Sequence, residues 1–215
     1  MAKDLTLYID AFWISPYAFS NFVALREKGL EFELVELSLP DKDHHAEFFQ
    51  KGSLTGRVPA LRHGDFWLSE SMAINEYLAE TFPFPKHPRL FPENLQERAR
   101  ARQLMDWVRS DLMPIREERT TASLFYDRPV QPLTAQGQAE AARLISVAQA
   151  LVAEDRTTLF GAWCLADADF SLMLNRLHKQ GHPLPAKVQR YVEANWQRPA
   201  LREWVDHPRK AFVPY

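Results

Sequence analysis

Three short stretches in the first third of the chain carry the residues whose types and spacing could do chemistry. The first contains Ser15, which follows an apolar, strand-like run and comes directly before Pro16. A serine followed by proline is typical of a helix start, where the serine caps the helix and the proline occupies its first turn. The same place offers unpaired backbone N–H groups and the positive end of the helix dipole. The Ser15 hydroxyl could therefore cap a helix or hold an anion such as a thiolate.

The second stretch is Ser69-Glu70-Ser71, where an apolar periodic segment indicates another helix start. One hydroxyl is enough to cap a helix, and we expect Ser69 to do so. The Ser71 hydroxyl and N–H would then suit a ligand carboxylate, while the Glu70 carboxylate would suit an ammonium group. Together they would match the α-amino acid end of a ligand. The alternative is structural, because acidic residues favour the first turn of any helix.

The third stretch is Val58-Pro59, which opens a short apolar run. Proline has no N–H to donate to a sheet, so a strand that contains it is interrupted or lies at an edge. If the Val58 backbone stays unpaired, its N–H and C=O can pair with an extended peptide, as an added strand would. The sequence leaves open whether the bond before Pro59 is cis.

The elements that must position these residues alternate between strand and helix over the first 82 residues. Strand patterns are expected at 5–9, 32–37, 58–61 and 66–68, and helix patterns at 16–28 and 69–82. Residues 41–52 are polar and fit neither pattern, and a turn at 63–65 joins the last two strands into a hairpin. A strand–helix–strand unit followed by a hairpin and a helix predicts a small mixed sheet with helices on its faces.

The remainder of the chain follows a different pattern. Four prolines within residues 83–92 exclude a helix interior and predict a stiff linker. Beyond it we expect helices at 94–118, with a kink or break at Pro114, at 134–154, at 167–179, and shorter ones at 185–195 and 199–206. The sequence therefore predicts an α/β domain at 1–82, a linker at 83–92 and an all-helical domain at 93–215.

Composition narrows the classes of function. The chain has 215 residues, 46% hydrophobic and 25% charged, as folded proteins do, and its net charge of −2 favours neither a nucleic acid nor a membrane surface as partner. A single cysteine, Cys164, permits no internal disulfide. The N-terminal residues lack the apolar core of a signal peptide and no apolar run reaches membrane length, so we expect a cytoplasmic protein. His178 and His182 lie at a helix end, and no metal site is expected.

In this order and spacing, the three stretches resemble the cytosolic glutathione S-transferase superfamily. The matching features are the Ser-Pro-Tyr helix start, the Val-Pro before a hairpin, and "SESMAINEYL" at 69–78. The segment at 159–177, "LFGAWCLADADFSLMLNRL", is similar to the buried helix start of that family. Cys164 stands there at the cap position and caps weakly, so we expect Asp167 to carry the folding role. Residues 98–119 and 161–170 are especially similar to a glutathione transferase of enteric bacteria.

The resemblance implies a thioredoxin-like α/β N-terminal domain, an all-α C-terminal domain and glutathione as co-substrate. It implies that Ser15 stabilises the glutathione thiolate, that the Val58 backbone pairs with the cysteinyl unit, and that the pair Glu70 and Ser71 holds the γ-glutamyl end. The site residues expected on this basis are Ser15, His44, Val58, Glu70 and Ser71.

His44 enters this set because related classes often place a basic residue there, fourteen positions before the Val58 equivalent, for the glycyl carboxylate. Lys42 and His45 are alternatives for the same role.

The activity that the resemblance implies is conjugation of a small electrophile, or reduction of a peroxide, by bound glutathione. Because position 15 holds serine rather than cysteine, a protein mixed disulfide cannot form there, which disfavours thiol transfer. We expect a homodimer that acts in detoxification or oxidative stress. The alternative is a non-catalytic interaction module of the same fold, against which Ser15, Val58 and the Glu70-Ser71 pair argue.

Overall fold

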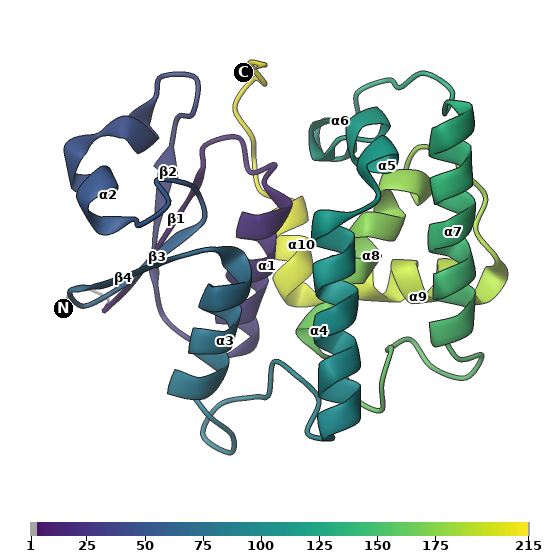
Figure 1. The fold of residues 1–215 in the computed structure, drawn as a ribbon, viewed down its shortest axis with the longest axis horizontal. Coiled ribbons are helices and arrows are strands. Elements are labelled where there is room, and N and C mark those ends of the chain that lie inside the picture. Colours follow the sequence, from purple (N-terminus) through teal and green to yellow (C-terminus); the bar gives the residue numbers. More distant parts are fainter. Residues whose placement is uncertain (1–3, 215) are drawn as a thin grey trace. The chain divides into compact units, whose positions relative to one another are not determined.

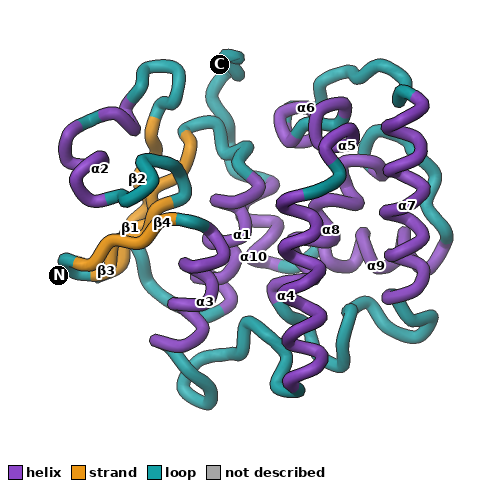
Figure 2. Tube along the Cα trace, in the orientation of Figure 1, coloured by secondary structure: helices purple, strands orange, loops and turns teal. Residues whose placement is uncertain are grey.

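The computed structural model describes residues 4–214, and its contacts group them into two compact units. One unit contains residues 4–90 together with 203–214, and the other contains residues 91–202. Figures 1 and 2 show strands in the first unit, whereas the second is built from helices. The expected helical domain included residues 203–214, which the contacts group with the α/β unit. The expected domain boundaries, after residue 82 and before residue 93, stay a prediction.

The first unit is built on a four-stranded mixed sheet in the order β2-β1-β3-β4. The strands are β1 (Leu5–Asp10), β2 (Glu33–Leu37), β3 (Ala60–His63) and β4 (Phe66–Ser69). β1 is parallel to β2 through a crossover containing α1 (Pro16–Glu27), and β3 is antiparallel to both β1 and β4. The expected strand–helix–strand unit and hairpin are therefore confirmed, as is the thioredoxin-like α/β class.

The polar stretch at 41–52, which fitted no pattern, forms a 3₁₀ turn, η1 (Asp43–His45), and a short helix, α2 (Glu47–Gly52). Phe49 of α2 is fully buried and packs with Tyr8 of the central strand and with Trp67. A Cβ at Gly52 would come within 2.5 Å of the Trp67 ring. The ring can therefore lie against α2 only because residue 52 has no side chain.

Helix α1 is buried around its whole circumference, since residues 18–25 are all inaccessible to solvent. It packs against α3 (Ser71–Thr81) on one side. Trp204, which belongs to the same unit, covers it on another, with its ring centroid 5.4 Å from that of Phe22 and 5.9 Å from that of Phe19. Trp204 is itself completely buried. This explains why α1 lacks the polar face that an amphipathic surface helix would show.

The second unit contains helices and no strand among its described residues, as expected. Its helices are α4 (Leu95–Ser110), α5 (Met113–Glu118), α6 (Thr121–Phe125), α7 (Ala135–Leu151), α8 (Leu165–His178) and α9 (Ala186–Trp196), and α10 (Pro199–Val205) starts in it. The break in the first predicted helix lies at Leu112, whose φ is +60°, and not at Pro114. Pro114 instead occupies the first turn of α5, where its missing N–H leaves no helical bond unmade. Helix α6 was not predicted.

The central helix of this unit, α8, has thirteen buried residues and begins after Cys164. The Asp167 carboxylate accepts hydrogen bonds from the backbone N–H groups of Cys164, at 2.9 Å, and Leu159, at 2.7 Å. Burial raises the pKa of Asp167 to about 6. The Cys164 side chain and the Asp167 carboxylate together form a capping box at this helix start. That Asp167 carries the folding role stays a prediction. Across residues 4–214, every helix is too short or too polar to span a membrane.

Candidate functional site

The strand register brings the candidate residues to one edge of the sheet. Tyr8 near the end of β1 pairs with Ala60 at the start of β3, and Ala60 also pairs with Ser69 at the end of β4. The connections from β1 to α1, from β2 to β3 and from β4 to α3 therefore all leave or enter this edge. Ser15, His44, Val58 and the Glu70-Ser71 pair lie in these connections, although their separation in sequence is large.

Ser15 lies at the N-terminus of α1, where its Oγ accepts a hydrogen bond of 3.2 Å from the Ala18 N–H. Its hydroxyl hydrogen has no acceptor among the described residues. Its own N–H, like that of Ile14, donates to the carboxylate of Asp10, which is fully buried. Burial raises the pKa of Asp10, and the two N–H donors act against that rise. Ser15 is thus both a helix cap and a free donor, held by Asp10.

Val58 precedes the first paired residue of β3, so its backbone takes no part in the ladder. The Val58-Pro59 bond is cis. Pro59 is buried, whereas Val58 is partly exposed. The unpaired backbone that the sequence suggested for Val58 is therefore present at the sheet edge.

Glu70 is the residue before α3, and its φ of +71° is in the left-handed region that few residues other than glycine adopt. Its side chain is exposed and does not cap the helix. The prediction that Ser69 caps this helix is wrong, because Ser69 is the last residue of β4 and is paired with Ala60. A strained non-glycine backbone at a helix start is the kind of outlier found at binding sites.

Ser71 begins α3 and is fixed from the neighbouring helix. Asn21 of α1 donates through its Nδ2 to the Ser71 carbonyl, at 2.9 Å, and to Asn75 Oδ1, at 2.7 Å. Asn75 in turn donates to Ser20 Oγ at 3.0 Å. These buried bonds lock the N-terminal turn of α3 to α1, so the positions of Ser15 and Ser71 are coupled.

His44 lies in η1, in the connection between β2 and β3. It is half-buried, whereas Lys42 and His45 are exposed. Its Nδ1 is buried and has no hydrogen-bond partner among the described residues. Burial, followed by the neighbouring His45, lowers the pKa of His44.

The loop that carries Ser15 is held by residues more than 190 positions further along the chain. The Trp13 indole stacks on the His207 ring with centroids 3.5 Å apart and donates to Glu36 Oε1 at 2.8 Å. Arg209 donates to the carbonyls of Trp204, at 2.8 Å, and Trp13, at 3.4 Å. Trp13 has a φ of +54° and is 4% exposed, so this strained backbone is enclosed on both sides.

Family models of known proteins match most of both units. The model of the glutathione S-transferase N-terminal domain matches residues 4–80, and that of the C-terminal domain matches residues 94–210. The chain belongs to the glutathione S-transferase family. A crystal structure of a glutathione transferase homologue from Burkholderia, with bound glutathione, is 44% identical to it, covers 94% of this chain and 96% of its own, and superposes with a TM-score of 0.79.

Other glutathione S-transferase relatives match over parts of the chain or at lower identity. Glutathione S-transferase 1 of Dianthus caryophyllus is 38% identical over 53% of this chain and 49% of its own length, so that alignment spans about half of the relative. The structure of a maleylacetoacetate isomerase from Methylobacterium extorquens, with bound malonate and glutathione, is 28% identical over 93% of this chain and 95% of its own, with a TM-score of 0.69.

Sequence reasoning missed the residues that hold this candidate site in place. Asp10 carried a usable signal, because a carboxylate at the end of an otherwise apolar strand must find donors when buried. Asn21 sat within an apolar helix and carried a similar signal. No sequence pattern near His207 or Arg209 predicts their contacts with Trp13. Among residues 4–214, no group of three or more histidine, cysteine or acidic side chains could hold a metal ion.

The contacts of Arg209 and Lys210 with the first unit predict unequal effects on stability. Arg209→Ala is expected to lower the free energy of unfolding by about 1–3 kcal/mol, because buried carbonyls lose their charged donor. Lys210→Ala is expected to cost less than about 1 kcal/mol, since the Lys210 side chain is 71% exposed and pairs with Glu36 at the surface. Urea unfolding followed by tryptophan fluorescence measures both. Equal losses would contradict the role assigned to Arg209.

Proposed function

We propose that this chain is a glutathione transferase that binds glutathione at the sheet edge and ionises its thiol with Ser15. The observation that carries the proposal is the convergence, within one unit, of a free hydroxyl donor at a helix N-terminus, an unpaired extended backbone and a strained acidic helix start. The Burkholderia homologue with bound glutathione supports the choice of ligand.

Each proposed contact suits one part of the tripeptide. The Glu70 carboxylate accepts from the γ-glutamyl ammonium group, and the Ser71 N–H and hydroxyl donate to the γ-glutamyl carboxylate. The Val58 backbone pairs with the cysteinyl unit in the manner of an added strand. His44 faces the glycyl carboxylate, because it is the least exposed of the three basic candidates and has a free buried nitrogen.

The energy required of Ser15 is modest. Lowering a thiol pKa from about 8.5 by about two units stabilises the thiolate by roughly 2.7 kcal/mol. One charge-assisted hydrogen bond together with the N-terminal end of α1 supplies an effect of this size. The hydrogen bonds from Ile14 and Ser15 to Asp10 fix the hydroxyl beforehand, so that little order is lost when glutathione binds.

The thiolate then attacks an electrophile or reduces a peroxide. Thiol transfer through a protein mixed disulfide is disfavoured, because residue 15 is serine. Glutathione-dependent isomerisation is a second candidate, favoured by the maleylacetoacetate isomerase of Methylobacterium extorquens among the relatives. We also propose that the protein is a cytoplasmic bacterial homodimer acting in detoxification or oxidative stress, with the Burkholderia homologue in support of the bacterial origin.

Titration with reduced glutathione tests the binding site. The wild-type protein is expected to bind glutathione saturably in the calorimeter, and Glu70→Ala/Ser71→Ala is expected to weaken binding by at least about a hundredfold, because two charge-assisted contacts are lost. Glu76→Ala, on the same helix, is the control and should bind as the wild type does. A wild-type protein that ignores millimolar glutathione would favour the non-catalytic interaction module.

The role of Ser15 is tested by the pKa of the bound thiol. Ser15→Ala is expected to raise this pKa by about one unit or more, which corresponds to roughly 1.4 kcal/mol, and to lower the rate with a chromogenic electrophile about tenfold below neutral pH. Ultraviolet absorbance of the thiolate, followed against pH, gives the pKa. Asn94→Ala removes a different helix cap and controls for the loss of capping alone. An unchanged thiol pKa in Ser15→Ala would remove Ser15 from the mechanism.

His44 predicts a pH dependence of affinity. Burial lowers its pKa from 6.5, so the free imidazole is neutral at physiological pH and becomes a cation, the stronger partner for a carboxylate, only as the solution is acidified. Affinity for S-methylglutathione, which has no titrating thiol, is therefore expected to rise about three- to tenfold between about pH 8 and about pH 5.5. His44→Ala should flatten this dependence and His45→Ala should keep it. The opposite result would assign the contact to His45.

A further inference from the structure

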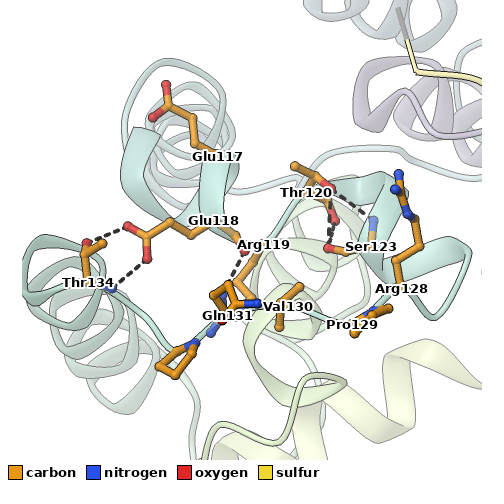
Figure 3. Close-up of a pocket in the computed structure, with 11 residues that line it drawn as sticks. Glu117, Glu118, Arg119, Thr120, Ser123, Arg128, Pro129, Val130, Gln131 and Thr134 are labelled. Atoms are coloured by element: carbon orange, nitrogen blue, oxygen red, sulfur yellow. Dashed lines mark hydrogen bonds between the residues drawn. The ribbon is translucent and has the colours of Figure 1, made fainter.

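A pocket separate from the candidate glutathione site lies within the helical unit, between α5, α6 and the loop that leads to α7. It has a volume of about 360 Å³, and Figure 3 shows the residues that line it. Its wall carries two arginines, Arg119 and Arg128, together with hydroxyl and amide side chains and the apolar Pro129 and Val130. The proposed glutathione site uses none of these residues, so this pocket needs its own explanation.

Arg119 is the unusual member of the pocket, because it is a charged side chain that is only 6% exposed. Its Nη1 donates to the Glu118 carbonyl at 2.8 Å, whereas its buried Nε has no hydrogen-bond partner. Within residues 4–214 no carboxylate forms an ion pair with it. A buried cation without a counter-charge is costly, and proteins rarely keep one unless something pairs with it.

Hydrogen bonds from Thr134, and to a smaller extent the charge of Arg119, lower the pKa of the Glu118 carboxyl. Glu118 therefore balances part of the Arg119 charge, although it forms no ion pair with Arg119. Both oxygens of the Glu118 carboxylate are occupied by Thr134, one by its N–H at 2.8 Å and one by its hydroxyl at 2.7 Å. A Cβ at Gly137 would come within 2.7 Å of the Glu118 carboxylate, so glycine at the start of α7 makes room for this contact. Glu117 is exposed, and Figure 3 shows it pointing away from Arg119 and Glu118.

Other basic side chains lie near Arg119. Arg176, which is 4% exposed, donates through Nη1 to the Arg119 carbonyl at 2.7 Å. Burial, followed by the charge of Arg119, lowers the pKa of His182. Arg128 adds a further cation to the pocket wall. The amide of Gln131, also in the wall, has no partner among the described residues and can donate to a ligand.

We propose that this pocket binds a small organic oxyanion, in which a carboxylate or phosphate group pairs with the Arg119 guanidinium. The guanidinium is planar and presents a fork of donors that matches either group with two parallel hydrogen bonds. The volume is at the lower end of the range for small-molecule pockets, and Pro129 and Val130 offer contact to an apolar part of the ligand. The site is distinct from the glutathione site and does not depend on it.

The test is calorimetric titration of the full chain, without glutathione, using sodium benzoate in one arm and sodium phosphate in the other. Saturable binding in either arm is expected, with the tighter arm identifying the group. Arg119→Met, which keeps the length of the side chain but removes its charge, should weaken that binding at least about tenfold. Arg116→Met, in the last turn of α5 just before Arg119 but outside the pocket wall, is the matched control and should bind as the wild type does.

Thermal unfolding without added anion distinguishes a ligand site from a structural arginine. If Arg119 serves to bind a ligand and does not stabilise the fold, Arg119→Met should unfold at the same temperature as the wild type or at a higher one. The substitution removes a buried charge that forms no ion pair. A markedly lower unfolding temperature would identify Arg119 as structural and overturn the proposal. Unchanged anion binding in Arg119→Met, or no saturable binding of either anion by the wild type, would overturn it as well.

Discussion

The antiparallel pairing of β1 with β3 is the constraint on which the rest of the candidate site depends. It places the start of β3 beside the end of β1, and the pairing of Ala60 with Ser69 adds the end of β4 to the same edge. A shift of one residue in this register would place Tyr8 and Ala60 on opposite faces of the sheet, so that only one of them could pack with Phe49 of α2. The packing of Phe49 and Trp67 on Tyr8 opposes such a shift.

Two kinds of interaction then convert an edge of a sheet into a site with fixed geometry. Buried polar side chains, Asp10 and Asn21, satisfy backbone groups at the starts of α1 and α3 and leave few alternative arrangements. Aromatic packing around Trp13 encloses the loop between β1 and α1. The groups that would meet glutathione remain unused by the fold, namely the Ser15 hydroxyl hydrogen, the Val58 backbone and the Glu70 carboxylate. This division between holding and contacting residues is typical of preorganised sites.

Local patterns predicted most of the fold and suggested the candidate site residues, which stay a prediction. Long-range packing decided the features that these patterns missed. Ser15 before Pro16 and the Asp167 helix start carry their meaning in a few neighbouring residues, and both were interpreted correctly as helix starts. Ser69 was misassigned because strand pairing with Ala60 overrode its preference for a cap. The break before α5 was placed at the proline, although the chain turns at Leu112 through a backbone conformation that no sequence rule assigns to leucine.

The grouping of residues 203–214 with the first unit has a consequence for how this protein is made. During synthesis the whole second unit emerges after residue 90 and before Trp204, His207 and Arg209 are available. Until then the nascent sheet unit exposes the faces of Phe19, Phe22 and Trp13 that these residues later cover. The loop bearing Ser15 therefore acquires its final packing late, and an incomplete chain exposes an aromatic surface, which favours aggregation.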